Sequence, residues 1–193
     1  GQLSHEDGAV RHGHAVTASL GHGGLGWAAK EYPLLAWLGR RKVEGDGRTP
    51  AGLFPLGPAF GRRAASTGLP FRRSKPGDTC VDDPSSEKYN LIVSAAPGKP
   101  RPKGEDMYGI SAYELGVVVQ QNPPPAIPNG GSCIFLHEWA ALHAPTPGCV
   151  AMSSTALRRI VKWLNKERNP HILILPATAY LTVRDQFGLP RID

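Results

Sequence analysis

Short alternations of apolar and polar residues run along this chain, and they predict a mainly β fold. Residues 15–20 alternate apolar with polar side chains, which is typical of a half-buried strand. Residues 115–121 contain three consecutive valines, whose branched side chains favour a buried strand. Further short apolar runs predict strands at 53–60, 91–94, 133–137, 171–175 and 180–184.

One main helix is predicted at residues 153–168. Ser153 or Ser154 can cap its start by accepting a backbone N–H, and Pro170 follows its end. Its apolar residues recur at helical spacing: Leu157, Ile160, Val161 and Leu164. Many short strands with one main helix indicate an antiparallel β-sandwich or barrel with the helix packed against it.

The connections between these elements are rich in turn-forming residues. The 193 residues include 23 glycines and 19 prolines, which favour turns over long helices. Turn residues cluster at 42–52 and 122–131, and 62–77 is a basic loop. The glycine-rich run 21–26 is interpreted as a turn, since no Lys-Ser/Thr pair follows it as a phosphate-binding loop requires. The length fits a single domain over 1–193, with the polar segment 1–13 loosely held.

The net charge of +6 and the pI near 9.4 favour an anionic partner, such as nucleic acid, an anionic membrane or an anionic cell-wall polymer. The basic residues are scattered along the chain, and no aromatic-interleaved basic stripe marks a nucleic-acid platform. We therefore expect a solvated positive surface and no nucleic acid partner. The sequence has no run of about 18 apolar residues, so it predicts no membrane-spanning helix.

The strongest candidate chemistry lies between residues 132 and 152. A catalytic cysteine needs a base and backbone N–H groups that hold the oxyanion formed on attack. Cys149 follows Gly148, and both can offer an N–H, whereas Pro147 cannot. Cys149 also precedes the predicted helix, so its side chain would feel the positive helix end. His137 ends a buried strand and is the candidate general base.

Each of these residues also has a structural interpretation. Cys149 could be a structural cysteine in a turn, and His137 a satisfied core histidine. His143 is a competing base, ranked second because it lies in a loop with less positional constraint. The group that orients the imidazole is left open between a backbone carbonyl near Glu138 and the Glu138 side chain.

A metal site is a weaker interpretation of the same residues. His137, His143 and Cys149 are spaced by six and six residues, which does not match zinc-ligand patterns, and no CxxC accompanies them. Chemistry by a pair of carboxylates at Asp82 and Asp83 is also disfavoured, because adjacent residues of an extended segment point opposite ways. We therefore expect neither a metal nor an organic cofactor.

The chain has three cysteines. If Cys149 is the working thiol, Cys80 and Cys133 are left to pair, which would imply an oxidising compartment. The alternative is that both are reduced, buried residues that act as small hydrophobes.

Five blocks together resemble the YkuD-type L,D-transpeptidase catalytic domain, a family of periplasmic cysteine enzymes of peptidoglycan cross-linking. The blocks are, in chain order, KVEGDGRTPAGLF, CVDDPSSEKYN, VVVQQN, GGSCIFLHEW and PTPGCVAM. The resemblance runs from about Gly13 to the strand predicted at 171–175. It implies the β-sandwich of that family, with a catalytic cleft and one main helix after the catalytic cysteine.

The resemblance also implies a role for each matching residue. Cys149 would be the nucleophile and His137 the general base, while Gly148 would shape the loop and share the oxyanion hole with Cys149. Four residues are expected to contact substrate: Asp82, Tyr108, Glu138 and Thr146. The carboxylates of the EGDG and DDP blocks, including Asp82, are candidates to hold a cationic acceptor amine, although building turns is the favoured role for them.

The implied reaction cleaves a peptidoglycan stem tetrapeptide after diaminopimelate, releases D-Ala and passes the acyl-enzyme to another amine. The product would link diaminopimelate to diaminopimelate or to L-Ala, in cell-wall biogenesis and the maintenance of cell shape. L,D-carboxypeptidase action, hydrolysis of existing cross-links, a non-catalytic wall-binding module and a zinc-dependent hydrolase are the alternatives. Carbapenem β-lactams would acylate Cys149. We expect a monomer in the periplasm, exported by a signal peptide that this chain does not include.

This sequence departs from the common family pattern at several positions. The usual Ser-His-Gly-Cys motif has Pro147 in place of its histidine, and Ala151 stands where arginine is frequent. Glu138 replaces the glycine that follows the catalytic histidine, and the spacing between His137 and Cys149 is short.

Overall fold

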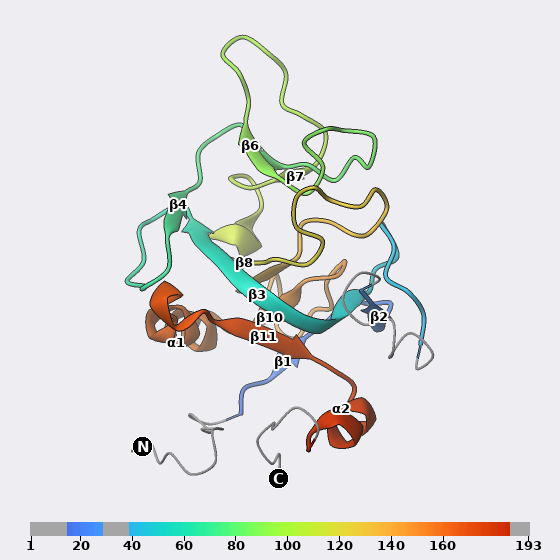
Figure 1. Ribbon diagram of the computed structural model, residues 1–193. Helices are drawn as coiled ribbons and strands as arrows, with labels where there is room; N and C mark the ends of the chain where they lie inside the picture. Colours follow the sequence, from blue (N-terminus) through green and yellow to red (C-terminus); the bar gives the residue numbers. More distant parts are fainter. Residues whose placement is uncertain (1–14, 29–38, 186–193) are drawn as a thin grey trace.

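The computed structural model describes residues 15–28 and 39–185, and its main elements are strands, as predicted (Figure 1). The strands are β1 Ala18–Ser19, β2 Leu25–Trp27, β3 Thr49–Gly61, β4 Phe71–Arg73, β5 Asp78–Cys80, β6 Ile92–Ser94, β7 Glu105–Asp106, β8 Leu115–Val119, β9 Phe135–Glu138, β10 Val150–Met152 and β11 His171–Ile174. The α-helices are α1 Ser154–Trp163 and α2 Ala177–Val183, and the short 3-10 helices are η2 Ser111–Tyr113 and η3 Lys166–Arg168. The loosely held segment predicted at 1–13 lies outside the described residues.

Two sheets organise the described part of the chain. The larger sheet has the order β1-β10-β9-β8-β3-β11, and β2 and β4 also pair with β3. The smaller sheet has the order β6-β5-β7 and lies beyond one end of β3 (Figure 1). Most pairs are antiparallel, but β9 and β10 run parallel and adjacent. This parallel pair becomes important because it carries the candidate histidine and follows the candidate cysteine.

Strand β3 joins the two halves of the larger sheet, and its length corrects the prediction of turns at 42–52. Its first half pairs with β2 and β11, and its second half pairs with β4 and β8. The strand contains three prolines, at positions 50, 55 and 58. Pro58 lies where the register with β8 shifts between Leu56 and Ala59, at a bulge that tolerates a missing N–H. The strand predicted at 53–60 is therefore confirmed, and the structure extends it back to Thr49, into the end of the segment predicted as turns.

Helix α1 packs its apolar stripe against the larger sheet, and it is shorter than predicted. The Ser153 hydroxyl accepts the N–H of Ala156 at 3.2 Å, as expected of the cap. Leu164 then adopts an extended conformation, with φ −67° and ψ 135°, and is buried in the main core. Its carbonyl accepts the N–H of Gly68, which draws the chain away from the helix axis. The predicted continuation to residue 168 is instead the short helix η3.

The strand predicted at 180–184 is wrong, because this segment belongs to helix α2. Pro176 precedes the helix, where its fixed φ and missing N–H are tolerated. The buried residues Ala179 and Val183 are four positions apart, which places them on one face of a helix. The apolar residues of this segment therefore follow a helical period.

A disulfide joins Cys80 of β5 to Cys133, which lies just before β9, as predicted. It bridges the smaller sheet and the central part of the larger one. Cys149 is the free cysteine of the described residues, and its side chain is buried. No described helix has the length and apolar character that a membrane crossing requires.

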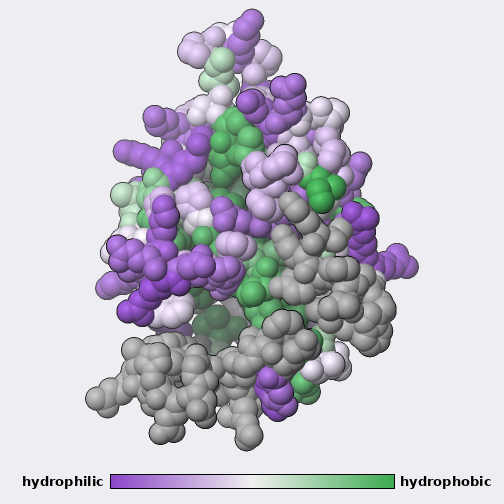
Figure 2. Space-filling view, viewed as in Figure 1, coloured by the Kyte–Doolittle hydropathy of each residue, from purple (hydrophilic) through white to green (hydrophobic). Residues whose placement is uncertain are grey.

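The surface seen from the side of β3 separates two kinds of residue (Figure 2). Hydrophilic residues gather over the part of the face where β4 and α1 lie, and hydrophobic residues run down its middle. The segments β4 and α1 carry paired arginines, at 72–73 and 158–159. These arginines add positive charge to the hydrophilic part of this face.

Candidate active site

The candidate histidine and cysteine are brought together by the parallel pairing of β9 and β10. His137 lies in β9, where it is aligned with Ala151 of β10 on one side and with Gly116 of β8 on the other. Cys149 immediately precedes β10, so it lies near Phe135 at the start of β9. His137 and Cys149 are twelve residues apart in the sequence, but the pairing of the two strands makes them neighbours.

The Cys149 thiol is buried against the backbone of the neighbouring strand, with 3% of the residue exposed. Its sulfur accepts the N–H of Phe135 at 3.3 Å, and the S–H donates to the carbonyl of Cys133 at 3.3 Å. Burial raises the pKa of the thiol well above its ordinary value, and the negative charge of Glu105 raises it further. The hydrogen bond from the Phe135 N–H and the nearby Tyr113 hydroxyl oppose this rise. The resting sulfur is therefore a protonated thiol that needs a base before it can attack.

Contrary to the expectation from the sequence, the positive N-terminal end of α1 does not lie next to the Cys149 side chain. Strand β10 lies between Cys149 and the cap of α1 at Ser153. Because the field of a helix terminus falls off within about one turn, the thiol depends on its closer neighbours.

His137 is prepared to act as a base. Its ring is largely buried, with 6% of the residue exposed, and its Nδ1–H donates to the backbone carbonyl of Glu138 at 2.6 Å. This bond fixes the tautomer that leaves a lone pair on Nε2. Burial lowers the pKa of His137 and outweighs the Glu138 interactions that raise it, so the neutral imidazole is held at pH 7.

Of the two orienting groups left open by the sequence, the structure uses the backbone carbonyl of Glu138. The Glu138 side chain points to α1, where its Oε1 accepts the Ser154 hydroxyl at 2.8 Å and lies 3.3 Å from the Arg158 guanidinium. In this structure the Glu138 side chain links β9 to α1, and its predicted contact with substrate stays a prediction.

Two threonines fix the backbone of Cys149. The hydroxyl of Thr146 donates to the Cys149 carbonyl at 2.7 Å, and the hydroxyl of Thr49 donates to the same oxygen at 3.1 Å. Thr146 also accepts the N–H of Gly148 at 3.1 Å, so this N–H reaches an oxyanion only after that bond is released. A Cβ at Gly148 would lie 2.9 Å from the carbonyl oxygen of Arg48, which is too close for any other residue. The loop conformation before the thiol therefore requires this glycine.

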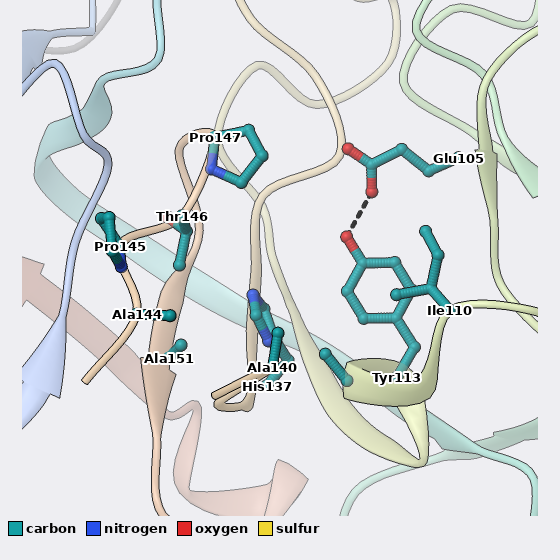
Figure 3. Close-up of a pocket in the computed structure, with 11 residues that line it drawn as sticks. Glu105, Ile110, Tyr113, His137, Ala140, Ala144, Pro145, Thr146, Pro147 and Ala151 are labelled. Atoms are coloured by element: carbon teal, nitrogen blue, oxygen red, sulfur yellow. Dashed lines mark hydrogen bonds between the residues drawn. The ribbon is translucent and has the colours of Figure 1, made fainter. Parts of the chain in front are cut away.

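A cavity of about 280 Å³ opens beside His137 (Figure 3). The loop 144–147 and Ala151 form one wall, and Glu105, Ile110 and Tyr113 form the opposite wall, with His137 and Ala140 between them. Cys149 lies behind this surface, next to Thr146 and Ala151, which do line the cavity. The cavity is therefore the place where a substrate would meet the imidazole, with the thiol directly behind the lining residues.

Tyr113 is the residue that sequence reasoning missed. Its ring lies edge-on to the His137 ring with centroids 5.3 Å apart, and its hydroxyl donates to Glu105. Burial raises the pKa of Tyr113, and the nearby charges of Cys149 and Glu105 raise it further, so the phenol stays protonated. A signal was present in the sequence, because Tyr113 ends the segment before the valine-rich strand. That strand pairs with β9 beside His137.

Three other candidates lie outside the cavity lining. Tyr108 is 38% exposed, with the Arg62 guanidinium 5.1 Å from its ring centre. Asp82 is half-buried and influences the site only through its charge on Glu105. His143 is exposed and lies edge-on to Trp139 at 4.6 Å, which agrees with its second rank as a base. Among the predicted substrate-contacting residues, Thr146 is the one that lines the cavity.

Comparison with known families identifies the same region. The family model of the YkuD L,D-transpeptidase catalytic domain matches residues 24–173, which include every site residue described above. Searches of curated proteins and of solved structures gave no match. Within residues 15–28 and 39–185, no group of three or more His, Cys, Asp and Glu side chains is arranged to hold a metal ion.

Proposed function

Because the chain belongs to the L,D-transpeptidase catalytic domain family, we propose that it is a peptidoglycan L,D-transpeptidase with Cys149 as nucleophile and His137 as general base. The observation that carries this proposal is the position of a free, buried thiol just before β10, beside the strand β9 that presents a neutral imidazole to the cavity. The imidazole has one nitrogen fixed by a backbone carbonyl and the other free to take a proton.

In the acylation step, Nε2 of His137 takes the proton of the Cys149 thiol. The thiolate attacks the diaminopimelate carbonyl carbon that is bonded to the D-Ala nitrogen in a stem tetrapeptide, and this C–N bond breaks. The imidazolium returns its proton to the leaving amine. A thiol with a raised pKa makes this proton transfer demanding, so the step depends on hydrogen bonds that stabilise the developing negative charge.

In the transfer step, an amine of a second stem attacks the thioester and restores the thiol. The acceptor is the amine on the side-chain centre of a second diaminopimelate, or the amine of L-Ala. Attack by water instead would give carboxypeptidase action. Acyl transfer of this kind needs no metal or organic cofactor. The β-lactam ring of a carbapenem would acylate the same sulfur.

We place this reaction in the periplasm. The disulfide between Cys80 and Cys133 supports an oxidising compartment, where the peptidoglycan substrate is also found. The positive net charge suits an anionic cell-wall polymer.

The test is incubation with purified diaminopimelate tetrapeptide muropeptides, followed by mass spectrometry, with Cys149→Ala as control. We expect a dimer that has lost one D-Ala with the wild type and none with the variant, and fragmentation identifies the linked amine. Tripeptide without dimer would replace the proposal by carboxypeptidase action. No change with either protein would favour a wall-binding module.

A further inference from the structure

The cavity contains a carboxylate that the acylation step does not use. We propose that Glu105 is the acceptor-binding residue of the transfer step: its carboxylate holds the ammonium of the incoming stem and takes the proton that the amine must lose. This inference rests on the proposed function, because it assigns the second substrate of the same cavity.

The position of Glu105 is fixed by the smaller sheet. Strand β7 pairs with β5 so that Glu105 lies opposite Cys80, which the disulfide ties to Cys133 before β9. The side chain reaches the cavity wall that faces Thr146 and Pro147 (Figure 3). Its attachment to both sheets holds the carboxylate at a set place relative to His137 and Cys149.

One oxygen of this carboxylate is available to a ligand. Oε2 accepts the Tyr113 hydroxyl, and Figure 3 shows the other oxygen pointing toward the side of the cavity where Pro147 lies. Among the residues that the structure describes, no hydrogen bond is made to Oε1. An ammonium in the cavity would therefore find one strong acceptor already oriented by a phenol.

The surroundings of Glu105 suit an exchange of protons near neutral pH. Burial raises the pKa of Glu105 to about 7, with the charges of Asp82 and Glu44 adding to the rise and the Tyr113 hydrogen bond opposing it. The Cys149 sulfur is the other ionisable group coupled to it. Among residues 15–28 and 39–185, the groups that shift the pKa of Glu105 are Tyr113, Asp82 and Glu44, none of which is basic, so its negative charge can serve a cation that enters the cavity. A carboxyl group with this pKa can both bind an ammonium and pass its proton on to water.

Other carboxylates near the site do not fit this role. The Glu138 side chain is bound by Ser154 and Arg158 on α1. Asp82 and Glu44 do not line the cavity. Glu105 is the one carboxylate among the lining residues that the structure describes.

The proposed step balances as follows. The ammonium gives one proton to the Glu105 carboxylate and becomes a neutral amine. The nitrogen lone pair attacks the thioester carbon, and the nitrogen gives its second proton to Nε2 of His137. The C–S bond then breaks, the sulfur leaves with the bonding electrons, and it takes that proton from His137. The products are an amide, the Cys149 thiol and one proton, which passes from Glu105 to solvent.

The experiment compares wild type with Glu105→Gln and Glu105→Asp, and uses Glu167→Gln on the exposed helix η3 as the matched control. Diaminopimelate tetrapeptide muropeptide serves as donor and acceptor at pH 7, and mass spectrometry follows the acyl-enzyme, the dimer and the tripeptide. Hydroxylamine, which is already neutral at pH 7, replaces the muropeptide acceptor in a parallel series. Acylation is read separately from the rate at which Cys149 gains the acyl mass.

For Glu105→Gln we expect the ratio of dimer to tripeptide to fall by about 100-fold, as for loss of a general base, with little change in acylation. Capture by hydroxylamine should be unchanged, and Glu105→Asp should recover at least part of the ratio. The Glu167→Gln control should behave as the wild type.

Two results would overturn the inference alone. One is normal acylation with an unchanged ratio of dimer to tripeptide in Glu105→Gln, and the other is an equal fall with hydroxylamine, which would show a structural role. A wild-type protein that never acylates Cys149 would overturn the proposed function, and with it this inference.

Discussion

The two walls of the cavity differ in how they are held and in how visible they are in the sequence. The wall that carries His137, with Cys149 behind it, belongs to the central sheet, where β8, β9 and β10 are joined in register, and is called the sheet wall below. The wall of Glu105 and Tyr113 comes from the two-residue strand β7 and the three-residue helix η2. The first wall therefore has its geometry fixed by the larger sheet, whereas the second depends on a two-residue pairing with β5, a disulfide and a few side-chain contacts.

This difference separates two kinds of chemistry. The sheet wall holds the nucleophile and base, whose relative position must be kept through both steps. The second wall holds a phenol and a carboxyl group that face the position of the incoming substrate. Variants on the sheet wall should therefore abolish the reaction, while variants on the second wall should change its rate or its product.

The largest effect is expected from His137→Gln. Without the base, acylation of Cys149 should slow by about 10²- to 10⁴-fold, measured with a carbapenem by the rate of mass gain. His143→Gln, which changes an exposed histidine next to Trp139, is the matched control and should leave the rate unchanged. If His143→Gln lowered the acylation rate more than His137→Gln, His143 would be the general base instead of His137.

The same assay predicts a pH dependence. Since burial lowers the pKa of His137 from its ordinary value near 6.5, the neutral base should persist below that pH. Acylation should thus stay level as the pH falls through 6.5 and decline only below it. A midpoint above 6.5 would contradict the stated environment of the imidazole.

The next effect concerns the attachment of the second wall. Replacing Cys80 and Cys133 together with alanine should lower the free energy of unfolding by about 2–4 kcal/mol, because the unfolded chain loses a cross-link between residues 53 positions apart. Urea denaturation measures this loss, with the free Cys149 retained in both proteins. An unchanged midpoint would show that the smaller sheet is held in place by its other contacts.

Tyr113→Phe should have a smaller effect on the first step. The nearby phenol favours the ionised sulfur, and a hydrogen bond from it to the charged sulfur would contribute about 1.5–3 kcal/mol, so acylation should slow by about 10- to 100-fold. Tyr180→Phe on α2 is a control outside the cavity. Unchanged acylation would limit Tyr113 to holding Glu105.

The sheet wall could be predicted from sequence because its chemistry is local. His137 ends an apolar run, and Cys149 follows a glycine that the loop requires. The pairing of Cys80 with Cys133 followed from assigning Cys149 as the working thiol.

The second wall could not be predicted in the same way. Glu105 follows a loop of ordinary polar residues, and its strand has two residues, too few for an alternating pattern. Its role depends on burial and on charges from distant segments, which include Asp82 and Glu44. The start of strand β3, before the strand predicted at 53–60, was missed for a related reason, since Thr49-Pro50-Ala51-Gly52 resembles a turn signal until the pairing partners are known.

The smallest effect is expected from Thr49, which supports the sheet wall from behind the thiol. Its hydroxyl accepts the N–H of Gly21 at 2.7 Å and donates to the Cys149 carbonyl at 3.1 Å. Thr49→Val keeps the shape but leaves a buried N–H without a partner, which should cost about 1–2 kcal/mol of stability by urea denaturation. Acylation should slow by only a few-fold, because Thr146 still holds the same carbonyl.

Thr49→Ser is the matched control, because it keeps the hydroxyl and loses only a methyl group. It should recover most of the acylation rate that Thr49→Val loses. If serine and valine instead reduced the rate equally, the methyl packing of this fully buried residue would position Cys149, and the hydroxyl would not. The sheet wall would then depend on side-chain packing as well as on its hydrogen-bonded backbone, and the contrast between the two walls would narrow.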